Sequence, residues 1–311
     1  MIDGICILFY IRLEIYYVTI QEEVPMAVRI LMDSACDMSQ ERAAKLNVNV
    51  MPLKIRFGED EYLDGVTMTN EEFYERLEKK EIIPKTSQIP PYEYEREFAS
   101  AKEAGDQVLC FTLSSGVSGC YQSACLAAQG YEDCVSVIDT KQFCISELVI
   151  VERAIQLRDE GKSFREIDEI IREEMKDARV VAVFDTLEYL RLGGRLSKAA
   201  AFTGTLLSIK PVLTIEDGQV KILAKARGSR HAFKTMNEVT GSLTPDYDRP
   251  VCFGFTGRTD ETIMKYLNES AGFYGGNERG KNIVSVGATI GTYAGPGAVA
   301  AAFFAKTNRT F

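Results

Sequence analysis

Residues 107–130 read QVLCFTLSSGVSGCYQSACLAAQG and combine three features in one short run. The apolar residues 108–113 come first and predict a buried strand. Serines and glycines follow at 114–119, and a helix of small residues then ends at Gly130. A strand that turns into a helix in this way directs free backbone N–H groups and hydroxyls at one point. Such a point suits a carboxylate or a phosphate group.

The composition is that of a globular protein of roughly two domains, with 311 residues and 46% hydrophobic content. The formal net charge of −9 and the lack of a basic stripe argue against binding to nucleic acid or to an anionic membrane surface. No uninterrupted run of 18 apolar residues occurs, so we expect no stable membrane insertion. The eight cysteines show no metal-binding spacing, which favours reduced thiols in a cytoplasmic protein without a metal site.

The first 25 residues differ from the rest of the chain. Their apolar start is interrupted by Asp3, Arg12 and Glu14, and it lacks the basic region and cleavage site of a secretory signal. Met26 stands directly before a clean strand pattern. We therefore expect residues 1–25 to be an extension outside the fold.

Strand and helix patterns alternate between residues 27 and 178. Apolar strands are predicted at 27–32, 49–57, 108–113 and 135–138, with helices between them, which indicates a parallel sheet with helices on both faces. From residue 179 the pattern changes to a hairpin around 216–219, helices at 229–241 and 259–270, and an apolar last helix after Gly297. The predicted fold class is α/β, with an N-terminal α/β domain at 27–178 and an α+β C-terminal domain at 179–308.

Three polar loops are candidates for one binding site: 86–88, 114–119 and 287–297. Each of them could instead only cap a helix or form a turn. The serine loop at 114–119 is the hardest to explain in that way, because ligands in open α/β sheets bind at the carboxyl ends of the strands.

A serine nucleophile is the main alternative to passive binding, with Ser115 or Ser118 as the reacting group. The sequence around Ser118 lacks the G-x-S-x-G pattern, and the only histidine, His231, lies on a predicted surface helix. A lysine could replace histidine as the base. The candidates, none of them in S-x-x-K spacing, are Lys85, Lys141 and Lys198.

Nucleotide-binding loops are missing from the sequence. Neither G-x-x-x-x-G-K-[ST] nor a G-x-G-x-x-G after the first strand occurs, which weighs against a phosphate cofactor and leaves a carboxylate as the favoured ligand. Positive charge in the second half gathers at Arg195 and at Lys225, Arg227 and Arg230. These side chains are either ordinary surface or a rim that faces an anion.

Seven motifs occur in order between Met26 and about Thr307: Met32-Asp33-Ser34, Lys85-Thr86-Ser87-Gln88, residues 114–124, Val137-Ile138-Asp139-Thr140-Lys141, residues 185–190 with Gly193-Gly194-Arg195, residues 207–211, and Gly295-Pro296-Gly297. Together they resemble the DegV family of bacterial fatty-acid-binding proteins, which includes the B subunits of fatty acid kinase. The resemblance implies one long-chain fatty acid between two α/β domains, with its tail buried in the first. It also implies a protein that is no enzyme itself and that presents the acid to a separate ATP-dependent fatty acid kinase.

The resemblance places the carboxylate at Thr86 and Ser118, with Ser115 as a nearby helper, and implies no cofactor besides the bound fatty acid. Arg195 and Arg227 fall on basic positions that face the head group or the kinase partner in the family. Tyr293 stands where the family often has histidine; its phenol can donate a hydrogen bond to a carboxylate but does not titrate near pH 7. The alternative function remains a serine-dependent acyl hydrolase or transferase.

Overall fold

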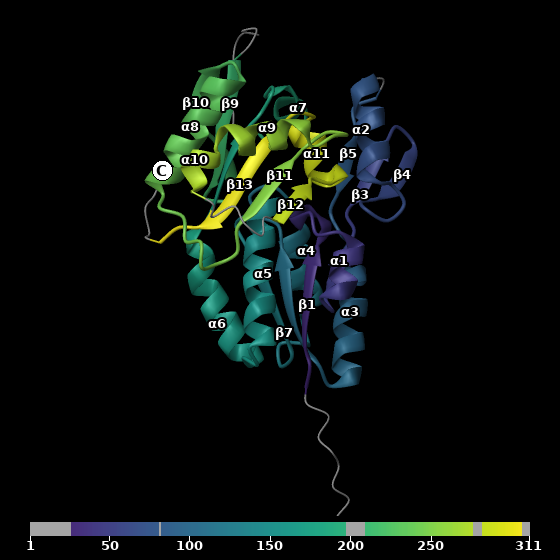
Figure 1. Cartoon of the computed structure of the whole chain (residues 1–311). Helices are drawn as coiled ribbons and strands as arrows, with labels where there is room; N and C mark the ends of the chain where they lie inside the picture. Colours follow the sequence, from purple (N-terminus) through teal and green to yellow (C-terminus); the bar gives the residue numbers. More distant parts are fainter. Residues whose placement is uncertain (1–25, 81, 197–208, 276–281, 307–311) are drawn as a thin grey trace, which may run out of the picture.

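The chain folds into a parallel sheet in the lower half of Figure 1 and a larger mixed sheet in the upper half, with a small third sheet beside it. The computed structural model describes residues 26–80, 82–196, 209–275 and 282–306. The predicted extension at 1–25, Lys198, residues 207 and 208 of the sixth motif and the end of the second domain at 307–308 lie outside the described residues.

The lower sheet has the order β2 (Asn49–Met51), β1 (Val28–Asp33), β6 (Gln107–Thr112), β7 (Val135–Asp139), and all neighbours are parallel. Side chains on these strands alternate between the two faces. Ile30, Met32, Leu109 and Phe111 pack in the cluster that contains α5 (Ile145–Asp159) and α6 (Phe164–Glu174). Leu31, Val108 and Cys110 pack with α3 (Pro91–Ala104) and α4 (Cys120–Ala127). The prediction of a parallel sheet with helices on both faces is confirmed.

The predicted strand at 49–57 is wrong as a single element. It divides at Pro52 into β2 and β3 (Lys54–Phe57), and β3 joins a separate antiparallel sheet with β4 (Asp60–Leu63) and β5 (Lys85–Ser87). Proline has no N–H to donate to a neighbouring strand, so it separates the two sheets. The helix α2 (Asn70–Lys79) packs its buried aromatic residues on this small sheet. Thr86 thereby lies on a strand rather than in a loop.

The upper sheet has the order β10 (Gln219–Arg227), β9 (Ile209–Glu216), β8 (Ala178–Val183), β13 (Val299–Phe304), β11 (Cys252–Phe255), β12 (Asn282–Ser285). Only β11 and β12 pair in parallel. One face packs against α8 (Ser229–Ser242), α9 (Glu261–Glu269) and α10 (Ala271–Tyr274). The other face is directed at α5 and the first sheet. The predicted hairpin is confirmed as β9–β10.

The apolar last helix predicted after Gly297 is also wrong. Val299–Phe304 forms β13, a strand between β8 and β11 in which every residue is buried. Alanine favours a helix by propensity, but a strand covered on both faces accepts small apolar residues, and tertiary packing decides. The helix lies earlier instead, within the glycine-rich stretch, as α11 (Ala288–Ala294).

The two sheets meet where the β9–β10 turn touches the serine loop. Ser114 Oγ donates a hydrogen bond to the Gly218 carbonyl at 2.9 Å. A Cβ at Gly116 would lie 2.8 Å from the same carbonyl oxygen, so only glycine fits there. The chain passes from one sheet to the other at Ala178, and we keep the domain division at about this residue as a proposal.

Candidate functional site

A cavity of about 380 Å³ lies between the two domains, where the serine loop, β5 and α11 meet. All three polar loops predicted from the sequence contribute to it. Its polar lining comprises Thr86, Ser87, Gln88, Ser118, Arg195, Thr289 and Tyr293. Its apolar lining comprises Leu53, Leu113, Val117, Phe143, Phe184, Leu190, Val220, Ile290 and Ala294.

The hydroxyls of Thr86 and Tyr293 join the two domains at this cavity. Thr86 Oγ1 and Tyr293 OH are 2.6 Å apart, and either can be the donor. Tyr293 reaches this place because its ring lies on Gly193, at which a Cβ would overlap the ring. Two hydroxyls that bond each other can both turn to an incoming carboxylate, since each is a donor and an acceptor.

Arg195 brings positive charge to the same cavity. Its guanidinium carbon lies 4.7 Å from the centroid of the Tyr293 ring, which is cation–π geometry. The side chain also donates a hydrogen bond to the Gly193 carbonyl at 2.8 Å. These contacts with Tyr293 and Gly193 hold the positive charge beside the hydroxyl pair.

Ser118 lies at the start of α4 with its hydroxyl in local contacts only. Its Oγ accepts a hydrogen bond from the Cys120 N–H at 3.3 Å and donates one to Cys120 Sγ at 3.4 Å. Because a thiol sulfur is a weak acceptor, the hydroxyl can turn its proton from Cys120 to a carboxylate in the cavity. Gln88 packs on Gly119 and donates to Ser123 Oγ at 2.8 Å, a supporting role that the sequence analysis missed although Gln88 belongs to the T-S-Q motif.

A second cavity, of about 60 Å³ and almost wholly apolar, continues from the first. The two share Phe143, Phe184, Val220, Ile290 and Ala294 in their linings. Most of its wall is the inner face of the upper sheet, and only Phe143 and Cys144 come from the first domain. This smaller cavity lies mainly against the second domain, whereas the resemblance implies a tail buried in the first, and the position of the tail stays a prediction.

A family model described as "Uncharacterised protein, DegV family" matches residues 27–306. The chain belongs to the DegV family. The DegV domain-containing protein of Caldanaerobacter subterraneus subsp. tengcongensis is 33% identical over 283 residues, covering 90% of this chain and 99% of that protein. A DegV domain-containing protein of Clostridium perfringens is 34% identical over 225 residues, covering 72% of this chain and 81% of its own. The resemblance inferred from the motifs is confirmed.

Solved structures of DegV proteins share the fold. One is described as showing fatty acid binding of a DegV family protein from Thermus thermophilus; it has a TM-score of 0.81 at 29% identity and covers 90% of this chain and 100% of its own. Another is described as a stearic acid-binding protein from Eubacterium ventriosum, with a TM-score of 0.79 at 29% identity, covering 89% of this chain and 98% of its own. The predicted α/β fold class is confirmed.

Ser115 lies outside the cavity lining of this DegV chain. Its Oγ accepts a hydrogen bond from Lys141 Nζ at 2.9 Å, and Lys141 forms an ion pair with Asp139 at 2.6 Å. Although burial opposes it, hydrogen bonds from Lys141 and Ser115 hold the pKa of Asp139 below its usual value. Lys141 Nζ therefore lies between Ser115 and Asp139 as a hydrogen-bond donor, outside the cavity lining.

Arg227 and His231 lie far from the candidate site in the fold. Both line a different pocket, of about 910 Å³, on the outer side of α8 with Arg230, Lys234 and Phe273. Neither lines the cavity between the domains. The structure thus brings Thr86, Ser118, Tyr293 and Arg195 together and leaves Ser115 and Arg227 outside the group.

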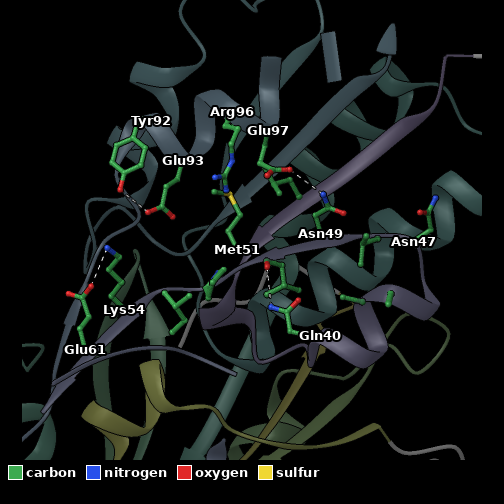
Figure 2. A pocket seen from close by; sticks show the side chains of 17 residues that line it. Gln40, Asn47, Asn49, Met51, Lys54, Glu61, Tyr92, Glu93, Arg96 and Glu97 are labelled. Atoms are coloured by element: carbon green, nitrogen blue, oxygen red, sulfur yellow. Dashed lines mark hydrogen bonds and ion pairs between the residues drawn. The ribbon is translucent and has the colours of Figure 1, made fainter. Parts of the chain in front are cut away.

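An open groove of about 820 Å³ runs along β2 between α1 (Gln40–Lys45) and α3 (Figure 2). Its polar groups are largely bonded to one another: Lys54 pairs with Glu61 at 3.3 Å, and Asn49 donates to Glu97 at 3.3 Å. The side-chain amide of Gln40 donates a hydrogen bond at 3.2 Å to the Val50 carbonyl on the outer edge of β2. The groove is more open to solvent and carries several charged side chains, so it would shield a hydrocarbon chain from water less well than the cavity between the domains.

Three buried aspartates accept hydrogen bonds from the backbone of segments that line the cavity or lead into it. Asp33 accepts from Ala35 N–H and Leu113 N–H, at 3.1 and 2.8 Å, and so fixes the start of the serine loop. Burial raises its pKa to about 7. Asp37 accepts from Gly287 N–H at 2.8 Å, and burial raises its pKa to about 8. Burial also raises the pKa of Asp64, which bonds the start of α11. In the sequence, Asp33 is recognised only as part of the motif Met32-Asp33-Ser34, and Asp37 and Asp64 carry no comparable signal.

Metal-binding clusters and membrane-spanning helices are both absent from the described ranges of the chain. No cluster of three or more Cys, His, Asp or Glu side chains there could hold a metal ion. Among the helices of the same ranges, none is both long and apolar enough to cross a bilayer.

Proposed function

We propose that this protein binds one long-chain fatty acid between its domains. The carboxylate lies among Thr86, Ser118 and Tyr293, and the acyl chain extends over the inner face of the upper sheet. The observation that carries this proposal is the continuity of a hydroxyl-lined cavity with an apolar one through five shared side chains. The fatty-acid-binding members of the family with the same fold support it.

The two parts of the site contribute different things to binding. Burying a chain of about 16 carbons contributes on the order of 10 kcal/mol at ~0.8 kcal/mol per methylene, before ordering costs. The hydroxyls add orientation, because a carboxylate accepts hydrogen bonds from groups that otherwise bond each other. Arg195 adds a positive charge next to the carboxylate.

The proposed task is to present the carboxyl end to a separate ATP-dependent fatty acid kinase, which would form the acyl phosphate. The family resemblance supports this step, and the place of Arg195 at the polar end of the cavity agrees with it. The protein itself then needs no nucleophile. Ser115, which accepts a hydrogen bond from Lys141 outside the cavity lining, is poorly placed to act as one.

Lipid extraction and mass spectrometry of the purified protein test the proposal. We expect about one equivalent of a long-chain fatty acid and no turnover of ester or thioester substrates. A sample without lipid whose ester turnover is abolished by Ser118→Ala would favour the acyl hydrolase or transferase instead. A bound acid with a short chain would point to a receptor for another carboxylate.

A further inference from the structure

The helix α11 carries Tyr293 and Thr289, and its first N–H groups donate hydrogen bonds to acceptors in the other domain. Its own N-cap residue is Gly287, which has no side chain to cap the first turn. Asp64, at the end of β4, accepts from the N–H groups of Ala288 and Thr289 at 3.0 and 3.1 Å. A helix start in a buried place needs such partners, because its first N–H groups have none within the helix.

Both carboxylate oxygens of Asp64 accept hydrogen bonds from the start of α11. The residue is 3% exposed, and its Oδ2 also accepts from the hydroxyls of Thr289 at 2.5 Å and Ser34 at 3.0 Å. Asp37 bonds the preceding N–H, that of Gly287, at 2.8 Å. A Cβ at Gly287 would lie 3.1 Å from Asp64 Oδ1 and 3.4 Å from Asp37 Oδ1, so glycine lets both carboxylates approach the helix.

We infer that Asp64 is a positioning residue for ligand binding: through the start of α11 it holds Tyr293 at hydrogen-bond distance from Thr86. The helix has only seven residues, so a shift at its first turn is carried to its last turn, where Tyr293 lies. Thr289, bonded directly to Asp64, lines the same cavity as Tyr293. The inference deepens the proposed function and relies on it only for the ligand-binding readout.

The substitution Asp64→Asn tests this with little change in volume. Asp64 Oδ1 faces one backbone N–H and Oδ2 faces another, so asparagine in either orientation sets its own NH₂ against a backbone donor. Hydroxyls can rotate away from such a conflict, but backbone amides cannot. The matched control is Asp60→Asn, since Asp60 lies on the same strand and is exposed.

The first measurement is hydrogen exchange in lipid-free protein, followed by mass spectrometry of peptides from 287–295 and from β13. We expect Asp64→Asn to speed exchange about tenfold or more in 287–291 and to leave β13 unchanged, as one lost charge-assisted hydrogen bond implies. Equal acceleration in β13 would mean general destabilisation and would overturn the positioning role. If Asp64→Asn does not fold, Thr289→Val removes only the hydroxyl and should speed the same amides by a smaller factor.

The second measurement is the release rate of radiolabelled palmitate in a double-mutant cycle with Tyr293→Phe. Asp64→Asn should speed release about tenfold in the natural background and about threefold in the Tyr293→Phe background, because its effect passes partly through the tyrosine hydroxyl. Fully additive effects would overturn the inference. If the natural protein binds no palmitate, the proposed function fails, while the exchange experiment still decides the role of Asp64.

Discussion

Thr86 on β5 and Tyr293 on α11 are 207 residues apart in the sequence, and their hydroxyl oxygens lie 2.6 Å from each other. This bond joins the small three-stranded sheet to the second domain at the polar end of the cavity. The polar lining of the cavity therefore comes from two domains, while the wall of the smaller, apolar cavity comes mainly from one. The predictions below separate these contributions.

Loss of the cavity hydroxyls should weaken retention of the fatty acid. Thr86→Val and Ser118→Ala each remove one hydrogen bond to a buried carboxylate, worth about 1.5–3 kcal/mol, so release should be roughly 10- to 150-fold faster. Release of labelled palmitate measures this. Ser115→Ala is the matched control, because Lys141 holds that hydroxyl outside the cavity lining. Unchanged release in both cavity variants would refute the site.

Binding should depend on pH in a Tyr293→His variant and much less in the natural protein. Histidine titrates near pH 6.5, so a protonated imidazole at pH 6 adds a charge-assisted hydrogen bond that is lost by pH 8. The variant should bind palmitate more tightly at pH 6 than at pH 8, measured by equilibrium dialysis. Tyr293→Phe serves as the control that lacks both hydroxyl and charge. The same pH dependence in Tyr293→Phe would show that another group causes it.

Arg195→Ala should leave most fatty acid bound and slow its phosphorylation by the partner kinase. The guanidinium lies against Tyr293 and Gly193, so its loss leaves the hydroxyl pair and the apolar wall in place. Bound lipid by mass spectrometry and acyl phosphate formation by a kinase assay give the two readings. Arg195→Lys keeps the charge but loses the planar donor group, and should fall between. Equal loss of binding and phosphorylation would show that Arg195 holds the ligand.

Enlarging Ala182 should shorten the acid that the protein retains. Ala182 lines the apolar cavity, so Ala182→Leu fills part of the room for the tail. Mass spectrometry of the co-purified lipid should show shorter chains or lower occupancy. Ala301→Leu is the control on the opposite face of the same sheet: overpacking there costs about 1–3 kcal/mol of stability and leaves chain length unchanged. The same chain shift in both variants would place the tail elsewhere.

Stability should fall as the pH rises from about 4 to about 8. Burial raises the pKa of Asp33 to about 7 and that of Asp37 to about 8, so in this window the native state keeps protons that the unfolded chain has lost. The slope is at most roughly 1.4 kcal/mol per pH unit for each group. Acids with lowered pKa, such as Asp139, act in the opposite direction but below about pH 4.

Urea unfolding at several pH values measures this slope, and Asp37→Asn should make it shallower. The titratable groups that interact with Asp37 are Asp33, Asp64, Cys144, Glu147, Tyr74, Cys36 and Cys252. None of them is basic, so no ion pair offsets the cost of ionising Asp37. A slope that is unchanged in Asp37→Asn, or a stability that rises with pH, would contradict the prediction.

Local patterns in the sequence predicted the parts of the fold that depend on neighbouring residues. The buried strand at β6 and the β9–β10 turn both follow from short-range chemistry. The errors arose where long-range packing decides. Pro52 sends β3 into another sheet, and the alanines of β13 form a strand only because both sheet faces are covered.

The candidate site was predicted in its parts but not in its assembly. Thr86, Ser118 and Tyr293 were identified by their place in motifs, and the structure brings them to one cavity. Asp64 gave no comparable signal, because an aspartate before a glycine at the end of a strand is ordinary turn chemistry. Its partners lie more than 220 residues further along the chain. No local pattern records a cap supplied from such a distance.

The capping of α11 from the first domain also bears on synthesis of the protein. Asp64 leaves the ribosome long before the helix that it caps, so of its hydrogen-bond partners the N-terminal domain at first supplies only Ser34. The polar end of the cavity is not complete until Tyr293 has been translated and the second domain has folded against the first. A nascent chain should therefore be unable to take up a fatty acid until nearly its whole length has been made.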